Sequence, residues 1–374
     1  MGVRREWVLL ALWLLVPLWL PAATQDVWSG VERIVAIGDV HGDYQQFVTM
    51  LRMAGLIDEN QKWIAGKAHL VQTGDVPDRG PDTRKVMDLL MRLEKEAIKA
   101  GGWVHPLIGN HEAMNIYGDL RYVVPGEFEA FRENNSERQR ELMYQQHIDN
   151  LRKSDGPMPK VDASYRKDWE SKHPLGYIEH RMAWAPQGTY GKWIKKHNAI
   201  VKINDTVFLH GGIGPKYANQ MIQKMNDRIR DEIEDTRLLQ NGVSIDPDGP
   251  LWYRGLAQGD ETAAAHVDTV LRNMGVQRIV IGHTVTAGTV TPRYGGKVVL
   301  IDNGMAEAYG SRQACLVIEG GKAHTLHRGQ KLELPVNNGS ALLEYFKQAA
   351  ALDPQPSPLA AAIRQLEEKL MSVK

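Results

Sequence analysis

The sequence predicts an α/β fold built on a largely parallel sheet, and two observations carry this prediction. Short apolar runs that stop at a glycine alternate with amphipathic stretches of helical period. Polar clusters rich in His, Asp and Asn follow several of those runs directly. A chain of 374 residues with 43% hydrophobic residues is long enough for one large domain or two ordinary ones.

The first half of the predicted fold alternates strands and helices. Strands are expected at residues 34–37, 69–73 and 103–108, each followed by glycine. An amphipathic helix is expected around Phe47, Met50, Leu51 and Ala54, which share one face. A second helix should run from residue 81 to about residue 100, where two glycines end it.

Residues 115–191 depart from this alternation and are interpreted as a helical insertion. Charged helical stretches at 127–153 lead into a loop at 156–159 that contains Gly and Pro, and no strand pattern is clear. The charged stretch is expected to be a solvated helix face, with a substrate lid as the alternative.

Strands resume after the insertion and complete one domain over residues 31–335. They are expected at 199–203, 206–209, 278–281, 297–301, 314–318 and 323–327. Helices are expected at 261–274 and around Met221, Met225, Ile229 and Ile233, whose stripe predicts a core face. Residues 336–374 are expected to form a C-terminal linker, proline-rich at 353–358, and a helix at 359–371.

Composition limits the classes of partner and of metal site. Lys plus Arg equals Asp plus Glu at 45 each, so the charge balance does not favour nucleic acid as a partner. Cys315 is the only cysteine, which excludes a disulfide framework and a cysteine-based zinc site within one chain. Any metal must therefore bind His, Asp, Glu or Asn.

The N-terminus has the pattern of a secretory signal peptide over residues 1–23. Arg4 and Arg5 precede an apolar run from Trp7 to Leu20, and small residues follow at 22–23. This run is shorter than the ~20 residues that span a bilayer. We expect an exported protein, periplasmic or secreted, with no stable membrane span after cleavage; the alternative is an uncleaved N-terminal anchor.

Five polar clusters lie where predicted strands end. In open α/β sheets the carboxyl ends of the strands form the binding site. The clusters are Gly38-Asp39-Val40-His41-Gly42, Gly74-Asp75-Val76-Pro77-Asp78-Arg79-Gly80, Gly109-Asn110-His111-Glu112, His210-Gly211-Gly212 and Gly282-His283-Thr284. Carboxylate, amide and imidazole ligands together suit divalent Mn, Fe, Zn or Co. Two such ions can clamp a phosphoryl group during in-line displacement.

These clusters, in this order over roughly residues 33–310, resemble the calcineurin-like metallophosphoesterases, specifically the phosphoprotein phosphatase branch. Residues 251–255 and 301–304 resemble the Shewanella-like phosphatases and the related bacterial cold-active tyrosine phosphatase. The resemblance implies a four-layer α/β/β/α sandwich. It also implies a hydrolase acting on phosphoproteins or small phosphomonoesters.

The resemblance further implies roles for single residues. Asp39 and His41 would bind the first metal, Asn110, His210 and His283 the second, and Asp75 would bridge both. A hydroxide between the metals would attack phosphorus. His111, oriented by Asp78, would protonate the leaving group. Arg79 and Arg254 would bind the phosphate oxygens, and Mn is the metal expected first.

The sequence also departs from the family pattern. Val285 stands where broader metallophosphoesterases have a second histidine, and the C-terminal signature of eukaryotic Ser/Thr phosphatases is absent. A dinucleoside-polyphosphate or nucleotide phosphohydrolase is an alternative enzyme, because it would share these motifs. An inactive phosphate-binding protein is the alternative from another class. The complete ligand set, with His111 and Asp78 also present, argues against it.

Overall fold

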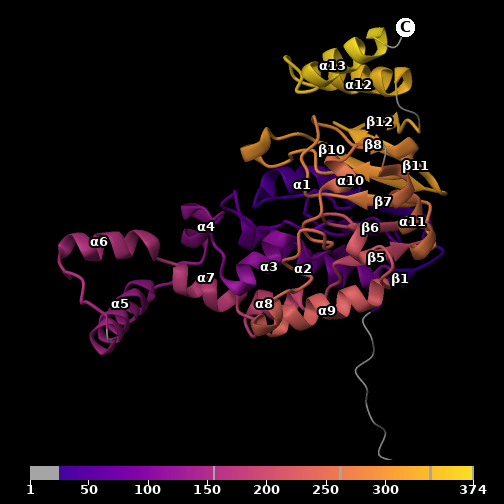
Figure 1. Ribbon diagram of the computed structural model, residues 1–374. Coiled ribbons are helices and arrows are strands. Elements are labelled where there is room, and N and C mark those ends of the chain that lie inside the picture. Colours follow the sequence, from indigo (N-terminus) through magenta and orange to yellow (C-terminus); the bar gives the residue numbers. More distant parts are fainter. Residues whose placement is uncertain (1–24, 155, 261–262, 337–338, 373–374) are drawn as a thin grey trace, which may run out of the picture.

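A computed structural model describes residues 25–154, 156–260, 263–336 and 339–372 of the chain. Two six-stranded sheets lie at its centre, with helices around them (Figure 1). The predicted signal peptide at 1–23 lies outside the described residues, as do the first two positions of the helix expected at 261–274. Among the described residues, no helix has the length and apolar character needed to cross a membrane.

The first sheet has the strand order β12-β11-β10-β2-β3-β4. Its strands are β2 (Arg33–Ile37), β3 (His69–Gln72), β4 (Trp103–Pro106), β10 (Ala314–Glu319), β11 (Lys322–His327) and β12 (Gln330–Glu333). β2, β3 and β4 pair in parallel, so their carboxyl ends lie at one edge. The others pair antiparallel.

The second sheet has the order β1-β5-β6-β7-β9-β8. Its strands are β1 (Val27–Trp28), β5 (Ile200–Ile203), β6 (Thr206–Leu209), β7 (Arg278–Ile281), β8 (Thr291–Arg293) and β9 (Val298–Leu300). β6, β7 and β9 are parallel, whereas β5 and β8 pair antiparallel with their neighbours β6 and β9. The expectation of largely parallel pairing was therefore wrong, because short links such as the two residues between β10 and β11 permit only antiparallel neighbours.

Alternating side chains of each sheet face two different cores. In β2, Ile34 and Ala36 pack between the two sheets, and Val35 and Ile37 face the helices. Helices α1 (Tyr44–Met53) and α2 (Thr83–Lys99) share the outer core with the first sheet, and α9 (Ile222–Glu234) and α11 (Ala264–Met274) share it with the second. This arrangement confirms the four-layer prediction. Met221 does not join the expected stripe, because it precedes α9 and is 71% exposed.

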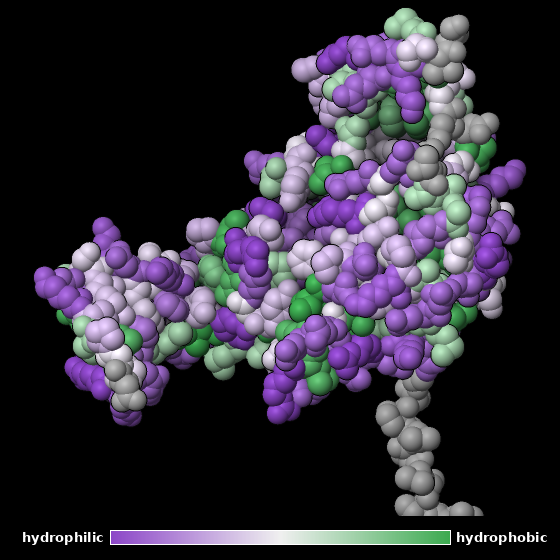
Figure 2. Space-filling view, in the orientation of Figure 1, coloured by the Kyte–Doolittle hydropathy of each residue, from purple (hydrophilic) through white to green (hydrophobic). Residues whose placement is uncertain are grey.

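Helices fill the described residues between β4 and β5, and none of those residues forms a strand. They are α3 (Asn110–Tyr117), α4 (Pro125–Ala130), α5 (Ser136–Lys153), α6 (Ala163–Lys172), α7 (Tyr177–Trp184) and α8 (Thr189–Ile194). α5 and α6 project from the body as an arm (Figures 1 and 2) with its own small core of Tyr144, Ile148 and Trp169. The solvated face expected at 127–153 fits much of α5. It is wrong for Glu127, which lies on α4 and is fully buried.

The C-terminal part has the helix expected at 359–371, preceded by the expected link at 353–358, and a further helix that the sequence analysis did not expect. The two helices are α12 (Ser340–Leu352) and α13 (Ala360–Ser372). Tyr345, Phe346 and Ala349 of α12 extend the core between the sheets, and the Tyr345 hydroxyl donates to the Val290 carbonyl at 2.8 Å. Short helical turns complete the fold: α10 (Gly255–Gln258) and 3₁₀ turns at Pro215–Tyr217, Thr236–Leu239, Tyr294–Gly296 and Glu307–Tyr309.

Candidate metal centre and active site

The five polar clusters follow β2, β3, β4, β6 and β7 and meet where those strands end. Close backbone approach requires glycine here. A Cβ on Gly74, which has φ +93°, would lie 2.6 Å from the Cα of Gly109. The loops after β3 and β4 therefore touch through their backbones, and this contact brings Asp75 next to the start of α3.

Several of the site residues have a left-handed backbone that non-glycine residues rarely adopt. The φ angles are +47° at His41, +57° at Asp75, +71° at Asp78, +67° at Arg79 and +64° at His283. Such conformations each cost about 1–3 kcal/mol and persist where the surrounding structure enforces them. Their concentration at the strand ends marks this region as functional.

Three side chains form one group of ligand atoms. His210 Nε2 lies 2.9 Å from Asn110 Oδ1 and 3.0 Å from His283 Nδ1. His210 Nδ1 lies 2.9 Å from the Thr73 carbonyl, which can only accept a hydrogen bond. Nδ1 therefore carries the proton, and the Nε2 lone pair points toward the other two side chains.

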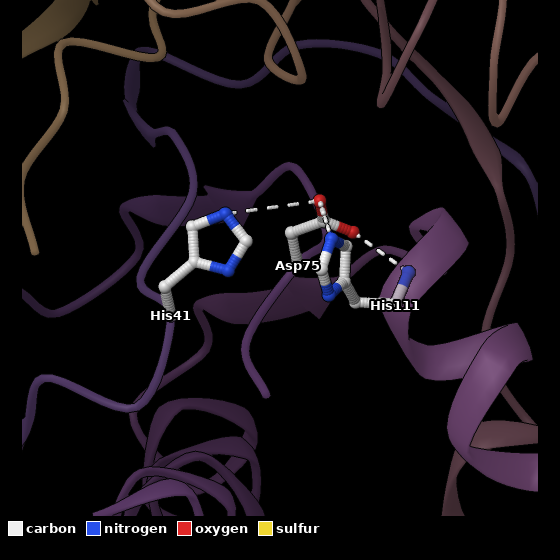
Figure 3. A group of neighbouring side chains, drawn as sticks. All are labelled: His41, Asp75 and His111. Carbon is white, nitrogen blue, oxygen red and sulfur yellow. Dashed lines mark hydrogen bonds and ion pairs between the residues drawn. The ribbon is translucent and has the colours of Figure 1, made fainter. Parts of the chain in front are cut away.

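Asp39, His41 and Asp75 form the adjacent group. His41 Nδ1 faces the Pro77 carbonyl at 3.1 Å, which leaves Nε2 free, 3.9 Å from a carboxylate oxygen of both Asp39 and Asp75. Figure 3 shows the Asp75 carboxylate between the His41 and His111 rings, where His111 Nε2 lies 3.7 Å away. The same Asp75 oxygen lies 3.2 Å from His210 Nε2, so Asp75 connects both groups.

The imidazoles determine the charge on Asp75. Burial alone would raise the pKa of Asp75, but His111 and His210 hold it well below its usual value. Burial, Asp302 and Asp75 instead raise the pKa of Asp39 well above its usual value. Burial lowers the pKa of His41 to about 4 and that of His283 to about 2, so both rings are neutral and are candidate metal ligands.

His111 and Asp78 form a buried pair beside these groups. His111 Nδ1 makes a short contact with Asp78 Oδ2, and Asn115 donates to Asp78 Oδ1 at 3.0 Å. Burial lowers the pKa of His111, but the Asp75 and Asp78 carboxylates outweigh that effect and raise it. The arrangement keeps His111 Nδ1 protonated and directs Nε2 toward Asp75 and the cavity.

Glu112 supports the loop that carries Asp75. Its carboxylate accepts from the backbone N–H groups of Asp75, Val76 and Gly109 at 2.7–2.9 Å. The Asp75 carboxylate in turn accepts from the His111 N–H at 2.9 Å. Burial and Asp75 raise the pKa of Glu112 to about 7. The sequence analysis quoted Glu112 within its motif but gave it no role.

Two arginines line the cavity, and they are the two that the resemblance implies as phosphate-binding residues. The Arg79 guanidinium stacks on the Tyr122 ring at 4.1 Å. Arg254 donates to the His283 carbonyl at 2.6 Å and to the Thr284 hydroxyl at 3.0 Å. Both therefore bring positive charge beside the candidate ligands.

Seven of the predicted site residues line one small cavity, together with residues that the sequence analysis did not assign, whereas Asp39, Asp78 and His210 are buried beside it. The cavity lining is His41, Asp75, Arg79, Asn110, His111, Tyr122, Trp252, Arg254, His283, Val285, Asp302 and Tyr309. The sequence analysis gave Asp302 no role in the site. It caps the turn at Gly304, with a 3.0 Å hydrogen bond, and it also faces Asp39 in the site. Its position after β9, like that of the other clusters, could have identified it.

The donor set fits two divalent cations. Two buried groups offer converging atoms, His41 with Asp75 and His111, and Asp75 with His210 and His283. Asp39 and Asn110 add oxygens to the first and second group, respectively. Neutral imidazoles and carboxylates around a shared Asp75 are the ligands that borderline divalent ions prefer, and a cation would offset the buried negative charge.

Comparisons with known proteins agree with this geometry. A family model described as calcineurin-like phosphoesterase matches residues 32–287. The chain is 33% identical to an uncharacterised protein of Schizosaccharomyces pombe, over 76% of each chain. It is 30% identical to Shewanella-like protein phosphatase 2 of Arabidopsis thaliana, over 74% of this chain and 72% of the relative. A crystal structure of the cold-active protein-tyrosine phosphatase of a psychrophilic Shewanella matches 83% of this chain and 82% of that one, with 27% identity and a TM-score of 0.62.

Proposed function

Because this chain belongs to the calcineurin-like phosphoesterase family, and is therefore a hydrolase of phosphate esters, we propose that it hydrolyses phosphate monoesters with two divalent metal ions. The observation that carries the proposal is the convergence of all six candidate ligands with the His111–Asp78 pair in one buried site. When bound, the ions supply electrostatic stabilisation of the phosphoryl group and activation of water. We propose Mn as the first candidate, because Mg²⁺ rarely accepts imidazole-rich sites.

The residues of this chain provide the remaining chemistry. Arg79 and Arg254 would bind non-bridging phosphate oxygens, where guanidinium geometry allows paired hydrogen bonds. Tyr122 orients Arg79 through its ring face. These arginines would also stabilise the charge that spreads over the phosphate oxygens as the ester bond breaks.

His111 would donate a proton to the leaving oxygen. The raised pKa favours the protonated ring, and Asp78 fixes its orientation through Nδ1. Nε2 is then the atom that faces the cavity and can transfer a proton. An alkyl leaving group needs this proton, whereas an activated aryl leaving group departs as a stable anion.

His111→Ala tests this function directly. We expect kcat for an alkyl phosphate to fall by roughly 10²–10⁴-fold, and kcat for p-nitrophenyl phosphate to fall much less. Metal content, measured on the same samples, should stay unchanged. His147→Ala, on the arm, is the matched control, because His147 contacts Tyr165 and not the site. Equal losses on both esters would remove His111 from this role.

A further inference from the structure

The segment from Tyr122 to Ala130, at the base of the arm, clamps the turn that carries Asp78 and Arg79. The Arg79 N–H donates to the Tyr122 carbonyl at 3.1 Å. Arg84, in the first turn of α2, donates to the Ala130 carbonyl at 3.0 Å. Gly126 lies so near the turn that a Cβ there would be 2.7 Å from the Cβ of Pro81. These contacts, at both ends of α4, hold the helix against the turn.

Glu127 is the buried polar side chain at the centre of this contact. Its carboxyl is fully buried and faces the backbone N–H of Asp78 and the hydroxyl of Thr83, although neither contact has the geometry of a full hydrogen bond. Burial and the Asp78 charge raise the pKa of Glu127 well above its usual value. This shift favours the neutral form of the carboxyl, which costs less to bury than the charged form.

The far side of Glu127 is also enclosed. His180 Nε2 of α7 lies 3.7 Å from Glu127 Oε1, and burial lowers the pKa of His180 to about 3. Phe128 and Phe131 pack on the His180 ring, with ring centres at 5.2 and 5.0 Å. Glu127 is held between a neutral imidazole and the Asp78 turn, so it cannot turn toward water.

The turn needs such support because its backbone is strained. Asp78 and Arg79 both have left-handed φ angles, and consecutive left-handed residues other than glycine are unfavourable. The Asp78 side chain is fixed by His111 and Asn115, whereas the Glu127 carboxyl faces the Asp78 backbone.

We propose that Glu127 is a positioning residue. It stabilises the conformation of the Asp78–Arg79 turn and, through Asp78, sets the orientation of the His111 ring. The proposal rests on the proposed function, in which His111 protonates the leaving group. Glu127 belongs to the insertion and lies outside the strand-end clusters, so the insertion would also help to orient the proton donor. Glu127 is not one of the candidate ligands and does not line the cavity.

Four proteins test the proposal: the parent chain, Glu127→Ala, Glu127→Gln and Glu129→Ala. Glu127→Gln keeps an acceptor oxygen and the shape of the neutral acid. Glu129→Ala is the matched control, because Glu129 lies on the same helix and is exposed. kcat and KM are measured with an alkyl phosphate and with p-nitrophenyl phosphate, after metal content is shown to be equal.

We expect Glu127→Ala to lower kcat for the alkyl ester by up to roughly 10²-fold, the scale of a small misplacement of a catalytic group. The aryl ester should lose far less, and KM should change little for either. Glu127→Gln and Glu129→Ala should stay near the parent. Equal losses on both esters in Glu127→Ala, or a Glu127→Gln loss as large as that of Glu127→Ala, would overturn the positioning role.

A readout independent of activity separates this proposal from the proposed function. Amide hydrogen exchange in the peptide covering residues 76–82 reports opening of the turn. We expect faster exchange there in Glu127→Ala only. Unchanged exchange would overturn the proposal even if the enzyme is a phosphatase. Faster exchange in a chain that hydrolyses neither ester would support the structural part and refute the proposed function.

Discussion

Replacing Asp78 by Asn should move the pH dependence of catalysis in a defined direction. Asp78 is fully buried, and its carboxylate contacts His111 Nδ1 and the Asn115 amide. Asn has nearly the same shape and keeps an acceptor oxygen. The substitution therefore removes the charge while it preserves most of the packing, and the effect on His111 can be measured without a cavity.

The expected magnitude follows from the contact. A hydrogen bond to a charged partner contributes about 1.5–3 kcal/mol and a neutral one about 0.5–1.5 kcal/mol. The midpoints of these ranges differ by about 1.25 kcal/mol, which corresponds to about one pKa unit. Loss of the Asp78 charge should lower the pKa of His111 by about that amount. Asp75, whose carboxylate remains 3.7 Å from Nε2, still raises it.

The sign of the effect on rate follows from the role of His111. A general acid must be protonated, so activity that depends on it is present below its pKa and lost above. Asp78→Asn should therefore shift the alkaline limb of kcat for an alkyl phosphate about one pH unit lower. Above that limb, kcat should be about tenfold below the parent.

The assay is kcat against pH for the parent, Asp78→Asn and the control Asp82→Asn. Asp82 lies in the same segment and pairs with Lys85 at 2.7 Å, with no contact to His111. For p-nitrophenyl phosphate the limb should not move, because that leaving group needs no proton. A limb that moves to higher pH, or that moves equally for both esters, would refute the assignment of His111 as the acid oriented by Asp78.

Three further predictions address cofactor, export and substrate. Chelation should abolish activity and Mn should restore it at least as well as Mg, because two imidazoles face the Asn110 side of the centre; full activity in a verified metal-free sample would contradict this. The mature N-terminus, read by mass spectrometry, should lie near Thr24 in an exported fraction, whereas an intact Met1 on soluble cytoplasmic protein would exclude cleavage. Phosphotyrosine should have a higher kcat/KM than phosphoserine in the same peptide, because Tyr122, Trp252 and Tyr309 line the cavity. Tyr122→Ala should reduce the ratio of kcat/KM for phosphotyrosine to kcat/KM for phosphoserine. A clear phosphoserine preference in the parent would show that these aromatic residues do not determine selectivity.

The sequence was sufficient to predict which residues meet in the site, because those residues follow parallel strands. Asp39, Asp75 and Asn110 each follow a short apolar strand and a glycine. Once the strands are recognised, the geometry of a parallel sheet places their carboxyl ends together. Asp302 obeys the same rule, because it follows β9 and lines the cavity, although the sequence analysis gave it no role.

The sequence was insufficient for elements whose structure depends on tertiary packing. The helix α12 is an example, because its buried side chains complete the core between the two sheets. Glu127 is a single residue whose burial the sequence was also insufficient to predict. Glu127 and Glu129 are both acidic residues of α4, yet the Glu127 side chain is buried against the Asp78–Arg79 turn, whereas Glu129 is exposed. Local polarity cannot distinguish these two positions.

The insertion has two parts with different structural roles, and the helical pattern of the sequence does not distinguish them. The segment between α3 and α4 contacts the Asp78–Arg79 turn. Helix α7 contacts α3, where Arg181 donates to the carbonyls of Asn115 and Ile116. α5 and α6 have their own core and project away from the body. Because strained backbone persists only when its surroundings enforce it, the base of the insertion supports His111 and Asp78 from the side opposite the strands. We therefore expect any substrate selectivity that the insertion contributes to come from its base, where Tyr122 lines the cavity, and not from the arm.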